Sequence, residues 1–353
     1  MSAIVQSDVY FSGRDGYSAF RIPVIETAAD GSLLAFAEAR KHNFGDPGTE
    51  NNHIDLVLKR SGNGGRTWSQ MTVIENPGER WSAANPAVVL DCQSGRLWLH
   101  YLRCRPGRGS ERARPGTDDI RNLVRHSDDN GASWSEPGDI TAVCRDMADG
   151  KWRCTVAGPG GAIQDRKGRL VVPCWKTEPF GVFAIFSEDR GRTWERGDLV
   201  PGSEALGGNE DQLVELADGR IMIDFRQDAG PHRWTAISGD GGRTWPKPAP
   251  GQTVTPVCCA IERWTLESAG ADRNRIVWTG PKGPDRANLA ARVSRDEAGS
   301  FTSERLISNE PAAYSDMALL KDGSVGVLWE RGNYQYITFT RLDRNFLEPR
   351  AGQ

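Results

Sequence analysis

Ser61-Gly-Asn-Gly-Gly-Arg-Thr-Trp68 is the first copy of a motif that decides how this chain folds. Three further copies follow the pattern S-x-D-x-G-x-[ST]-W, with Asp in place of Asn63, and a fifth, degenerate copy ends in Phe. The later copies are Ser127–Trp134, Ser187–Trp194, Ser238–Trp245 and Ser294–Phe301. Successive final aromatic residues, starting from Trp68, are 66, 60, 51 and 56 positions apart. Self-similarity at such a period predicts an array of one repeated supersecondary unit.

The residue types in the motif explain why it should form a turn. The Asp side chain can accept hydrogen bonds from nearby backbone N–H groups, and the Gly supplies a backbone conformation that other residues resist. The Trp can fold under the turn and bury a large apolar area. Predicted strands precede the copies at residues 54–60, 122–126, 181–186, 232–237 and 288–293. Each copy is therefore predicted to close a β-hairpin, with Asn63 expected to weaken the first one.

A second set of tight turns alternates with the first. These turns begin at Asp30, Ser94, Lys167, Asp218 and Asp322, each followed by Gly. The strands expected after them cover residues 32–37, 96–102, 169–175, 220–226 and 324–330, with a sixth at 275–279. Six such units share 353 residues, or roughly 59 each,. This spacing predicts an all-β, six-bladed β-propeller of four-stranded antiparallel sheets, formed as a single domain by residues 1–353,. We expect a strand near residues 9–12 to close the ring beside residues 337–342.

The composition argues against several classes of protein. A net charge of −3 provides no global field toward nucleic acid or an anionic membrane,, and no stretch approaches the roughly 18 apolar residues of a membrane span. Seven cysteines without a CxxC pair predict reduced thiols,. With no signal peptide visible at the N-terminus, we expect a cytoplasmic protein, a secreted one whose leader was removed being the alternative. The five His residues show no ligand spacing, so we expect neither a metal nor a cofactor,.

Charged and phenolic residues cluster at one end of the predicted hairpins. Antiparallel partners around a turn have a constant index sum, which identifies the residues that face one another. The predicted partners are Glu210 with Arg226, Tyr314 with Glu330, and Arg21 with residues 38–40. Because the upper ends of propeller strands converge on a central axis, these side chains should approach one another. Asp46 and Arg286 fall in the upper loops of the first and fifth units.

At these positions the chain resembles a known family. Phe20-Arg21-Ile22-Pro23 is similar to the FRIP motif of sialidases (neuraminidases), and the Trp turns resemble their Asp boxes. The other matching segments are Asn209–Gln212 with Arg226, Asp285–Leu289, and Tyr314–Asp316 running to Leu328–Glu330. The match covers nearly the whole chain and is closest to the bacterial type of exo-α-sialidase. It implies hydrolysis of terminal, α-ketosidically linked sialic acids from glycoconjugates.

The resemblance also implies how the substrate is held. Three arginines, Arg21, Arg226 and Arg286, would bind the sugar's carboxylate, for which a guanidinium fork is geometrically suited,. Three clustered cations repel one another, so a nearby anion is needed, and Glu330 is the implied partner of Arg21. Arg40 is expected to support the site.

Three further residues carry the implied chemistry. Tyr314 is the implied nucleophile, because a neutral phenol can approach an anomeric carbon that bears a carboxylate, and neighbouring arginines would lower its pKa,. Glu210 is the implied base, since a phenol of pKa about 10 needs one. Asp46, in the loop at residues 41–53, is the implied acid and base at the leaving oxygen, with Glu50 and Asp55 as competitors,. A covalent tyrosyl intermediate with retention would follow, as sialidases depart from the two-carboxylate scheme.

Some features leave alternatives open. Asp211 and Asp224 depart from the family pattern and could alter the pocket for the glycerol chain or the C5 substituent. The sugar could then be deaminated neuraminic acid or a shorter ulosonic acid, and a non-catalytic propeller that binds acidic glycans is a third hypothesis. The arginine-rich stretch at residues 103–116 is either a solvated loop or a lid over an acidic glycan. We expect a sialylated or related acidic glycan as substrate, no nucleic-acid partner, and a monomer or weak oligomer.

Overall fold

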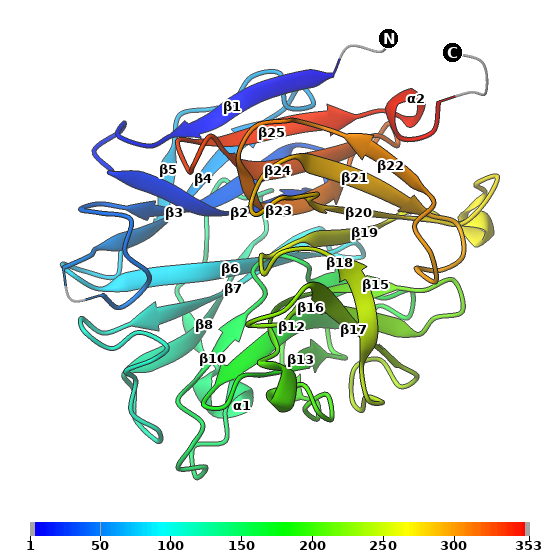
Figure 1. The fold of residues 1–353 in the computed structure, drawn as a ribbon. Helices are drawn as coiled ribbons and strands as arrows, with labels where there is room; N and C mark the ends of the chain where they lie inside the picture. The colour runs from blue at the N-terminus through cyan, green and yellow to red at the C-terminus, as the bar shows by residue number, and fades with distance from the viewer. Residues whose placement is uncertain (1–3, 50, 350–353) are drawn as a thin grey trace.

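The protein is built almost entirely from β-strands, as the computed structural model in Figure 1 shows. The structure describes residues 4–49 and 51–349. Its strands form five sheets, and the helical segments among the described residues are short. These segments are α1 (Thr141–Cys144), η1 (Glu204–Leu206), η2 (Glu267–Ala269) and α2 (Arg344–Leu347).

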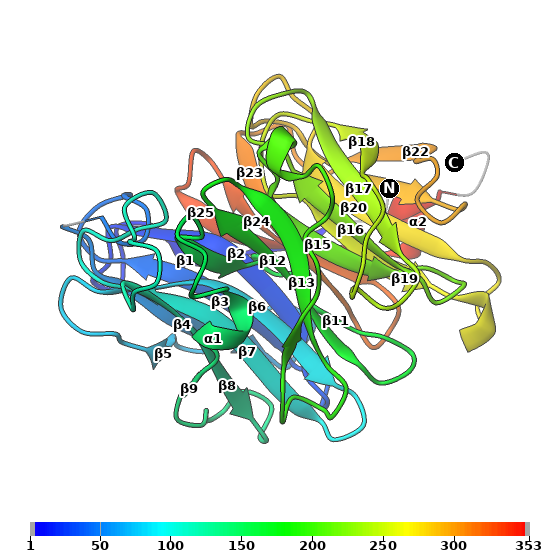
Figure 2. The same cartoon turned by 90° about the horizontal axis from the view of Figure 1, so that it is seen from below.

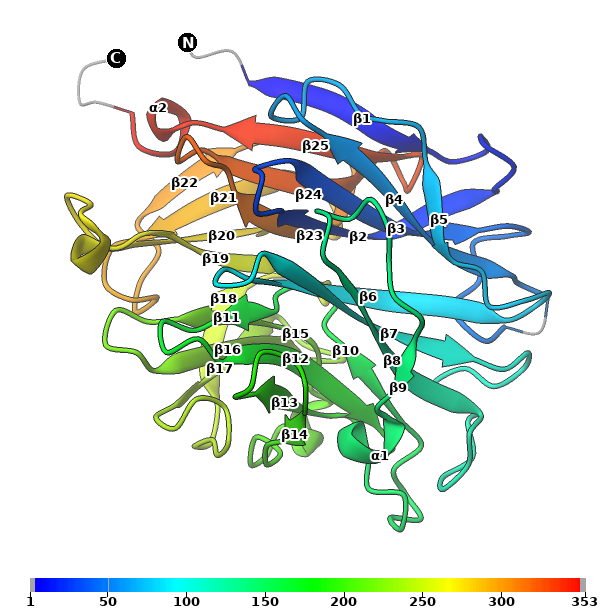
Figure 3. The ribbon, with the colours of Figure 1, turned by 180° about the vertical axis from the view of Figure 1, so that it is seen from behind.

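One sheet joins the two ends of the described chain. Its strands, in spatial order, are β1 (Val5–Phe11), β25 (Tyr336–Leu342), β24 (Val325–Arg331) and β23 (Ala312–Leu319). β1 pairs antiparallel with β25, and the two strands lie side by side in Figures 1 and 3. The prediction that an N-terminal strand pairs beside residues 337–342 is confirmed.

Three sheets come from the middle of the chain. The first contains β10 (Cys154–Ala157), β12 (Leu170–Thr177), β13 (Gly181–Ser187) and β14 (Glu195–Arg196), with β11 (Ile163–Gln164) also paired to β12. The second contains β15 (Asn209–Glu215), β16 (Ile221–Arg226), β17 (His232–Ser238) and β18 (Ala249–Thr253). The third contains β19 (Ala260–Thr265), β20 (Arg275–Pro281), β21 (Leu289–Ser294) and β22 (Ser303–Leu306).

The remaining sheet has eight strands. They are β2 (Ala19–Thr27), β3 (Leu33–Arg40), β4 (Ile54–Ser61), β5 (Thr72–Glu75), β6 (Ser82–Asp91), β7 (Arg96–Cys104), β8 (Ile120–Ser127) and β9 (Gly138–Asp139). Two antiparallel groups, β2–β5 and β6–β9, are joined by one parallel pair, Ile54 with Ser82. Five sheets therefore stand where six separate ones were predicted, because this single pair links the first two units. The arrangement, also seen from below in Figure 2, is all-β and propeller-like, with small antiparallel sheets.

The turn motifs hold their predicted hydrogen bonds. In the second copy the Asp129 carboxylate accepts bonds from the backbone N–H of Ser133 at 2.8 Å and from the Ser127 hydroxyl at 2.8 Å. Asn63 makes the equivalent bonds through its amide oxygen, and its amide nitrogen donates to Thr67 Oγ1 at 2.8 Å. The first copy therefore keeps the turn contacts, with a neutral amide in place of the carboxylate of the other copies.

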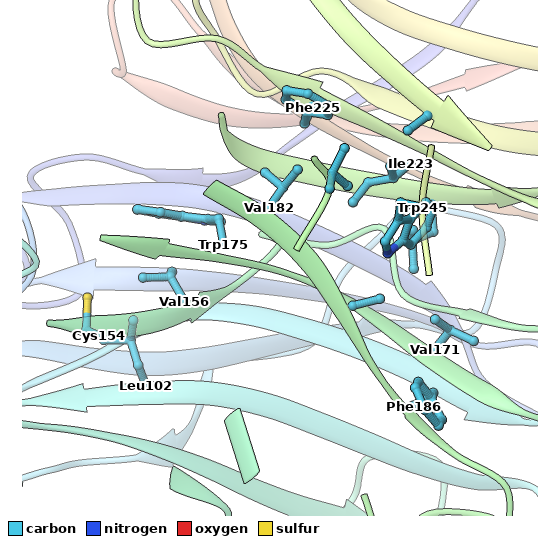
Figure 4. Packing of buried hydrophobic residues seen from close by; sticks show 14 of the residues in the cluster. Leu102, Cys154, Val156, Val171, Trp175, Val182, Phe186, Ile223, Phe225 and Trp245 are labelled. Atoms are coloured by element: carbon cyan, nitrogen blue, oxygen red, sulfur yellow. The ribbon is translucent and has the colours of Figure 1, made fainter. Parts of the chain in front are cut away.

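The motif tryptophans pack onto a neighbouring antiparallel group of strands rather than only under their own turn. The rings of Trp68 and Phe339 lie 5.5 Å apart, those of Trp134 and Phe36 lie 6.0 Å apart, and those of Trp194 and Trp98 lie 6.2 Å apart. Trp245 belongs to the cluster in Figure 4, which mixes residues of several sheets. Burial of such rings stabilises the contact between sheets by roughly 4 kcal/mol each.

No helix in the described part of the chain is both long and apolar enough to cross a membrane.

Candidate active site

Four inner strands are interrupted by a β-bulge. The bulges lie between Arg21 and Val24 in β2, Ala84 and Ala87 in β6, Asn209 and Asp211 in β15, and Ala312 and Ser315 in β23. A bulge re-aims the side chain that it leaves unpaired. Three bulge residues have positive φ, namely Ile22 (58°), Asn85 (50°) and Glu210 (32°). Of these three residues, Glu210 is a predicted site residue and Ile22 directly follows another, Arg21.

The bulges correct two predicted pairings. Asn209, not Glu210, pairs with Arg226, and the bulge in β23 leaves Tyr314 without the predicted partner Glu330. The predicted pairing of Arg21 with residues 38–40 is confirmed, since Arg21 lies opposite Glu38.

Glu330 organises the first arginine. Its carboxylate accepts a hydrogen bond from Arg21 Nε at 2.5 Å and another from Arg21 Nη2 at 3.3 Å. The same carboxylate accepts the backbone N–H groups of Ile22 at 3.0 Å and Tyr314 at 3.2 Å. The Glu330 side chain is fully buried, so this pair is largely desolvated. Glu330 therefore ties the start of β2 to the bulge of β23.

Tyr314 stands at the centre of the predicted site. Its hydroxyl donates a hydrogen bond to Glu210 Oε1, and Arg226 Nη1 lies 3.2 Å from the same hydroxyl oxygen. Arg226 Nη1 also donates to Glu210 Oε2 at 2.5 Å. The Arg21 guanidinium carbon lies 5.4 Å from the centre of the Tyr314 ring. The structure thus brings the predicted nucleophile, its predicted base and two of the three arginines into direct contact.

Arg286 reaches the same ring from the loop between β20 and β21. Its guanidinium carbon lies 5.5 Å from the centre of the Tyr314 ring. Arg286 Nη1 donates to the hydroxyl of Tyr334 at 3.0 Å, and Nη2 donates to the carbonyl of Pro256 at 3.0 Å. All three predicted arginines therefore approach Tyr314.

The loop at residues 41–53 carries Asp46 above this cluster. The Asp46 side chain is 84% exposed, and its Oδ1 accepts a hydrogen bond from Arg40 Nη1 at 3.0 Å. Arg40 is fully buried and is held by Glu38, whose Oε2 lies 2.7 Å from Arg40 Nη2. Arg40 Nη1 also donates to the carbonyl of Phe44 at 2.7 Å. Arg40 thus connects the loop to β3, in line with its predicted supporting role.

A cavity of about 270 Å³, here called the upper cavity, joins these groups. Its charged lining includes Arg21, Arg40, Asp46, Glu210 and Arg226, and Tyr314 also borders it. Arg286 lies outside this lining and borders a small adjoining cavity with Glu330 and Tyr334. The phenol is therefore accessible from the upper cavity although only 6% of Tyr314 is exposed.

One wall of the upper cavity is apolar. It contains Leu102, Ile120, Val156, Trp175 and Phe180. Leu102, Val156 and Trp175 lie next to one another in Figure 4, and they belong to a buried cluster that continues through the neighbouring sheets. The cavity can therefore hold a ligand with an anionic end and an apolar substituent.

The pKa of the Tyr314 phenol differs from expectation. Burial raises this pKa well above its ordinary value, and the negative charge of Glu210 raises it further. Arg226 and Arg21 lower it, as predicted, but their effect is the smaller one. The phenol is therefore protonated in the free protein, and the carboxylate of Glu210 is the acceptor to which it is hydrogen bonded,.

The two residues that depart from the family pattern do not border the upper cavity. Asp224 is buried and pairs with Arg233, whose Nε lies 2.8 Å from Asp224 Oδ1. Asp211 is fully buried, and burial raises its pKa well above the ordinary range. Both carboxylates are thus placed within the sheets, so the expectation that they alter the pocket is wrong for this structure.

Of the two competitors of Asp46, Asp55 has other partners. It is buried, accepts the Tyr17 hydroxyl at 2.6 Å and lies 2.8 Å from His53 Nε2. Glu50 lies outside the described residues.

Some residues of the site were not found from the sequence. The Arg21 guanidinium carbon lies 4.2 Å from the centre of the Tyr334 ring, so Tyr334 contacts two of the predicted arginines. Tyr334 has a positive φ of 68° in the turn between β24 and β25, and an aromatic residue at a tight turn was the available signal. Asn85 also borders the upper cavity, and Asn is a residue that tolerates its positive φ,.

The arginine-rich stretch at residues 103–116 is tied to carboxylates. The pairs are Arg103 with Glu75 at 3.7 Å, Arg105 with Asp118 at 2.7 Å, Arg108 with Asp119 at 3.7 Å and Arg114 with Asp119 at 2.8 Å. Ser110 and Glu111 border the upper cavity, whereas these arginines do not. The stretch thus forms part of the cavity wall through Cys104, Ser110 and Glu111 rather than through its arginines.

Among the described residues, no group of three or more His, Cys, Asp or Glu side chains is placed to hold a metal ion.

Comparison with known proteins finds similarity to sialidases. Residues 31–327 match the family model described as BNR repeat-like domain. A sialidase of Micromonospora viridifaciens is 28% identical over 359 residues, an alignment that covers 93% of this chain and 52% of the relative. A sialidase of Bacteroides fragilis (strain YCH46) is 27% identical, with coverages of 94% and 63%. The chain thus spans between half and two thirds of the length of these curated relatives.

The fold is shared with solved sialidase structures. The structure of the Hadza microbial sialidase Hz136 superimposes with a TM-score of 0.86 at 22% identity, covering 97% of this chain and 69% of that one. Together with the match to residues 31–327, which is most of the chain, this places the protein in its family. The chain belongs to the BNR repeat-like domain family, and it is similar over most of its length to bacterial sialidases.

Proposed function

We propose that the protein is a retaining exo-α-sialidase that removes terminal sialic acids from glycoconjugates through a covalent tyrosyl intermediate. One observation carries the proposal, namely that the hydroxyl of Tyr314 contacts both Glu210 and Arg226 while two further guanidinium groups lie against its ring. A nucleophile, its base and a cationic site for a carboxylate are thus assembled around one phenol. Similarity to sialidases supports the substrate class, and the contacts around Tyr314 support the reaction.

The sugar's carboxylate would bind among Arg21, Arg226 and Arg286. Glu330 and Glu210 compensate two of these cations in the free protein, which makes their clustering tolerable. Charge-assisted, bidentate contacts to the substrate would fix the anomeric carbon above the Tyr314 hydroxyl. Fixing the two reacting atoms in one geometry is itself a large part of the expected rate enhancement.

In the first half of the reaction the Tyr314 oxygen attacks the anomeric carbon. Its proton passes to Glu210 Oε1, with which it is already hydrogen bonded. The bond from the anomeric carbon to the leaving oxygen breaks, and Asp46 donates its proton to that oxygen. The products are a free alcohol and a tyrosyl-linked sugar.

In the second half a water molecule replaces the alcohol. The Asp46 carboxylate accepts a proton from this water, whose oxygen attacks the anomeric carbon. The bond to Tyr314 breaks, and Glu210 returns its proton to the phenolate. Two inversions give net retention, and the protein returns to its starting protonation state.

We also propose that the five sheets form a single, six-bladed catalytic domain. The eight-stranded sheet would count as two blades, because one residue pair alone joins its two antiparallel groups. The innermost strands support this count, since contacts run from β2 through β6, β11 and β12, β15, β19 and β23 back to β2. The catalytic groups would lie at one end of this ring.

The apolar wall of the upper cavity favours N-acetylneuraminic acid over the deaminated sugar or a shorter ulosonic acid. A methyl group buried against Trp175 and its neighbours gains roughly 1 kcal/mol,. We therefore expect a higher kcat/KM on the acetamido sugar. Equal or lower values than on the deaminated sugar would favour the alternative substrate class.

The experiment that tests the proposal combines turnover with trapping. The protein is expected to release the phenol from an aryl α-ketoside of sialic acid, and Tyr314→Phe should lower kcat at least about 1,000-fold because the nucleophile is lost. A 3-fluorosialyl fluoride should label the protein, and mass spectrometry of the digest should locate the sugar on the peptide that contains Tyr314.

Tyr336→Phe is the matched control, because its ring meets Phe11 edge to face and lies against Arg331, outside the residues that border the upper cavity. A glycan-binding protein without catalytic activity would release no phenol. Turnover that survives Tyr314→Phe, or a label on another residue, would contradict the proposed mechanism.

A further inference from the structure

We propose that the arginine-rich loop at residues 105–119 positions Asp46, and that Gly109 is the positioning residue through which it does so. The inference rests on the proposed role of Asp46 as proton donor. It concerns a contact between two loops that come from different strand connections, β3 to β4 and β7 to β8.

The contact is made by backbone alone. A Cβ atom added to Gly48 would lie 2.5 Å from Gly109 Cα and 2.8 Å from the carbonyl carbon of Arg108. A Cβ atom added to Gly109 would overlap the carbonyl oxygen of Pro47. Pro47 and Gly48 directly follow Asp46, so the two loops touch within two residues of the carboxylate.

The arginine-rich loop is anchored firmly enough to act as a support. Asp119 is fully buried and accepts hydrogen bonds from Arg114 Nε at 2.8 Å and Nη2 at 2.9 Å. Ala113, buried in the apolar cluster behind the cavity, donates its N–H to the carbonyl of Gly109 at 2.9 Å. Thr177 in β12 donates its hydroxyl to the carbonyl of Ser110 at 3.0 Å. These bonds fix Gly109 relative to two neighbouring sheets.

The loop that carries Asp46 has fewer ties to the sheets. Its nearest backbone anchor is the N–H of Gly48, which donates to Ser82 Oγ at 3.0 Å. Thr49 and Asn52 bond mainly within the loop, to the carbonyls of Asp46 and Gly45 at 2.5 Å each. Because the Asp46 side chain is mostly exposed, its position depends on Arg40 and on this backbone contact.

Gly109→Ala tests the contact directly. Gly109 does not have a positive φ, so alanine is compatible with its backbone conformation. The alanine methyl group would instead clash with the carbonyl oxygen of Pro47. We expect kcat/KM for a sialoside with an alkyl leaving group, such as a galactoside, to fall about 10-fold or more, since general acid catalysis contributes roughly 100- to 10,000-fold. With an aryl leaving group, which needs little protonation, the loss should stay below about 3-fold.

Gly150→Ala is the matched control. Gly150 also has an ordinary φ, and nothing lies within 4 Å of an added Cβ. It should leave both substrates unaffected. Equal losses on both substrates for Gly109→Ala, or no loss on either in a folded protein, would overturn the proposal.

Two further variants separate the possible failures. Asp46→Asn should also lose more kcat/KM with the alkyl than with the aryl leaving group. If the two losses are equal, the proposed role of Asp46 as proton donor is refuted. If Gly109 acts through Asp46, adding Gly109→Ala to Asp46→Asn should cause no further loss, whereas additive losses would refute the positioning role. If Gly109→Ala does not fold, Thr177→Val can replace it, because it removes the hydrogen bond to the carbonyl of Ser110. This variant should also lose more kcat/KM with the alkyl than with the aryl leaving group, and both losses should be smaller.

Discussion

The ring contains two cavities that share the same strands and differ in chemistry. The upper cavity, about 270 Å³, is bordered by the starts of β2, β15 and β23. A larger one of about 580 Å³, here called the lower cavity, is bordered by the ends of the same strands. Figure 2 places these three strands near the middle of the molecule. Arg21, Glu210 and Tyr314 face one cavity, while Glu26 and Asp316 face the other.

The two cavities differ in whether their carboxylates form ion pairs with arginines. In the upper cavity Arg21 pairs with Glu330 and Arg226 pairs with Glu210. In the lower cavity three carboxylates, Glu26, Glu262 and Asp316, form no ion pair within the described residues, and burial raises their pKa values to about 8, about 8 and about 7. The larger cavity is thus a poor candidate for chemistry on an anionic sugar. The guanidinium groups gathered around Tyr314, rather than the volume, identify the site.

The largest effect expected from this comparison of the two cavities is at the upper one. Arg21→Lys should lower kcat/KM on an aryl sialoside by roughly 100-fold or more, because a lysine cannot form the two-pronged contact to a carboxylate. It also leaves the fully buried Glu330 with a weaker partner. Steady-state kinetics with a measured melting temperature would check this.

Arg166→Lys provides the same substitution at the lower cavity. Arg166 pairs with Glu215 at 3.1 Å and is partly exposed. Its kcat/KM should stay within about 2-fold of the parent value, since exposed ion pairs contribute little. Similar losses for both variants would remove the functional distinction between the cavities.

The second prediction concerns the lower cavity and pH. Glu26 and Glu262 have folded pKa values near 8, above the ordinary 4.5, so the folded protein holds protons that the unfolded chain has released. The contribution of these two protonated carboxyl groups to the free energy of unfolding is complete below about pH 4.5, and it is lost as the pH rises through about 8,. The free energy of unfolding should fall by on the order of 1–3 kcal/mol over this interval.

Replacement of one carboxylate isolates this contribution. Glu262→Gln cannot ionise, so its unfolding free energy should fall less steeply between pH 5 and pH 8, as measured by urea denaturation. Glu195→Gln, which alters an exposed carboxylate, should leave the slope unchanged. If the unfolding free energy falls equally steeply with pH in the parent protein, Glu262→Gln and Glu195→Gln, the carboxylates of the lower cavity are charged and hydrated.

The sequence was sufficient for features that depend on local repeats. The turn motifs, the strands between them and the closing pair β1–β25 all follow from residue types at fixed spacing. The convergence of Arg21, Glu210, Arg226 and Tyr314 follows from the same regularity, because an antiparallel register carries side chains to a predictable end of each strand.

Features set by contacts between strands could not be predicted. The bulges at Glu210 and Tyr314 shift the pairing by one residue or more, and neither residue type signals a bulge. The packing of Trp194 on the preceding sheet depends on Trp98, which lies far away in the sequence. The raised pKa of Tyr314 depends on burial outweighing its arginines, a balance that only the folded geometry sets.

The smallest predicted effect tests a residue of the upper site that the sequence did not indicate. Tyr334→Phe removes the hydroxyl that accepts from Arg286 Nη1 at 3.0 Å but keeps the ring 4.2 Å from the Arg21 guanidinium. Loss of one hydrogen bond to a charged group should cost about 1–2 kcal/mol, so we expect KM to rise about 5- to 30-fold. If Arg286 binds substrate in both ground and transition states, kcat should change little. A fall in kcat at constant KM would instead place Arg286 in transition-state stabilisation, and no change in either would remove Tyr334 from the site.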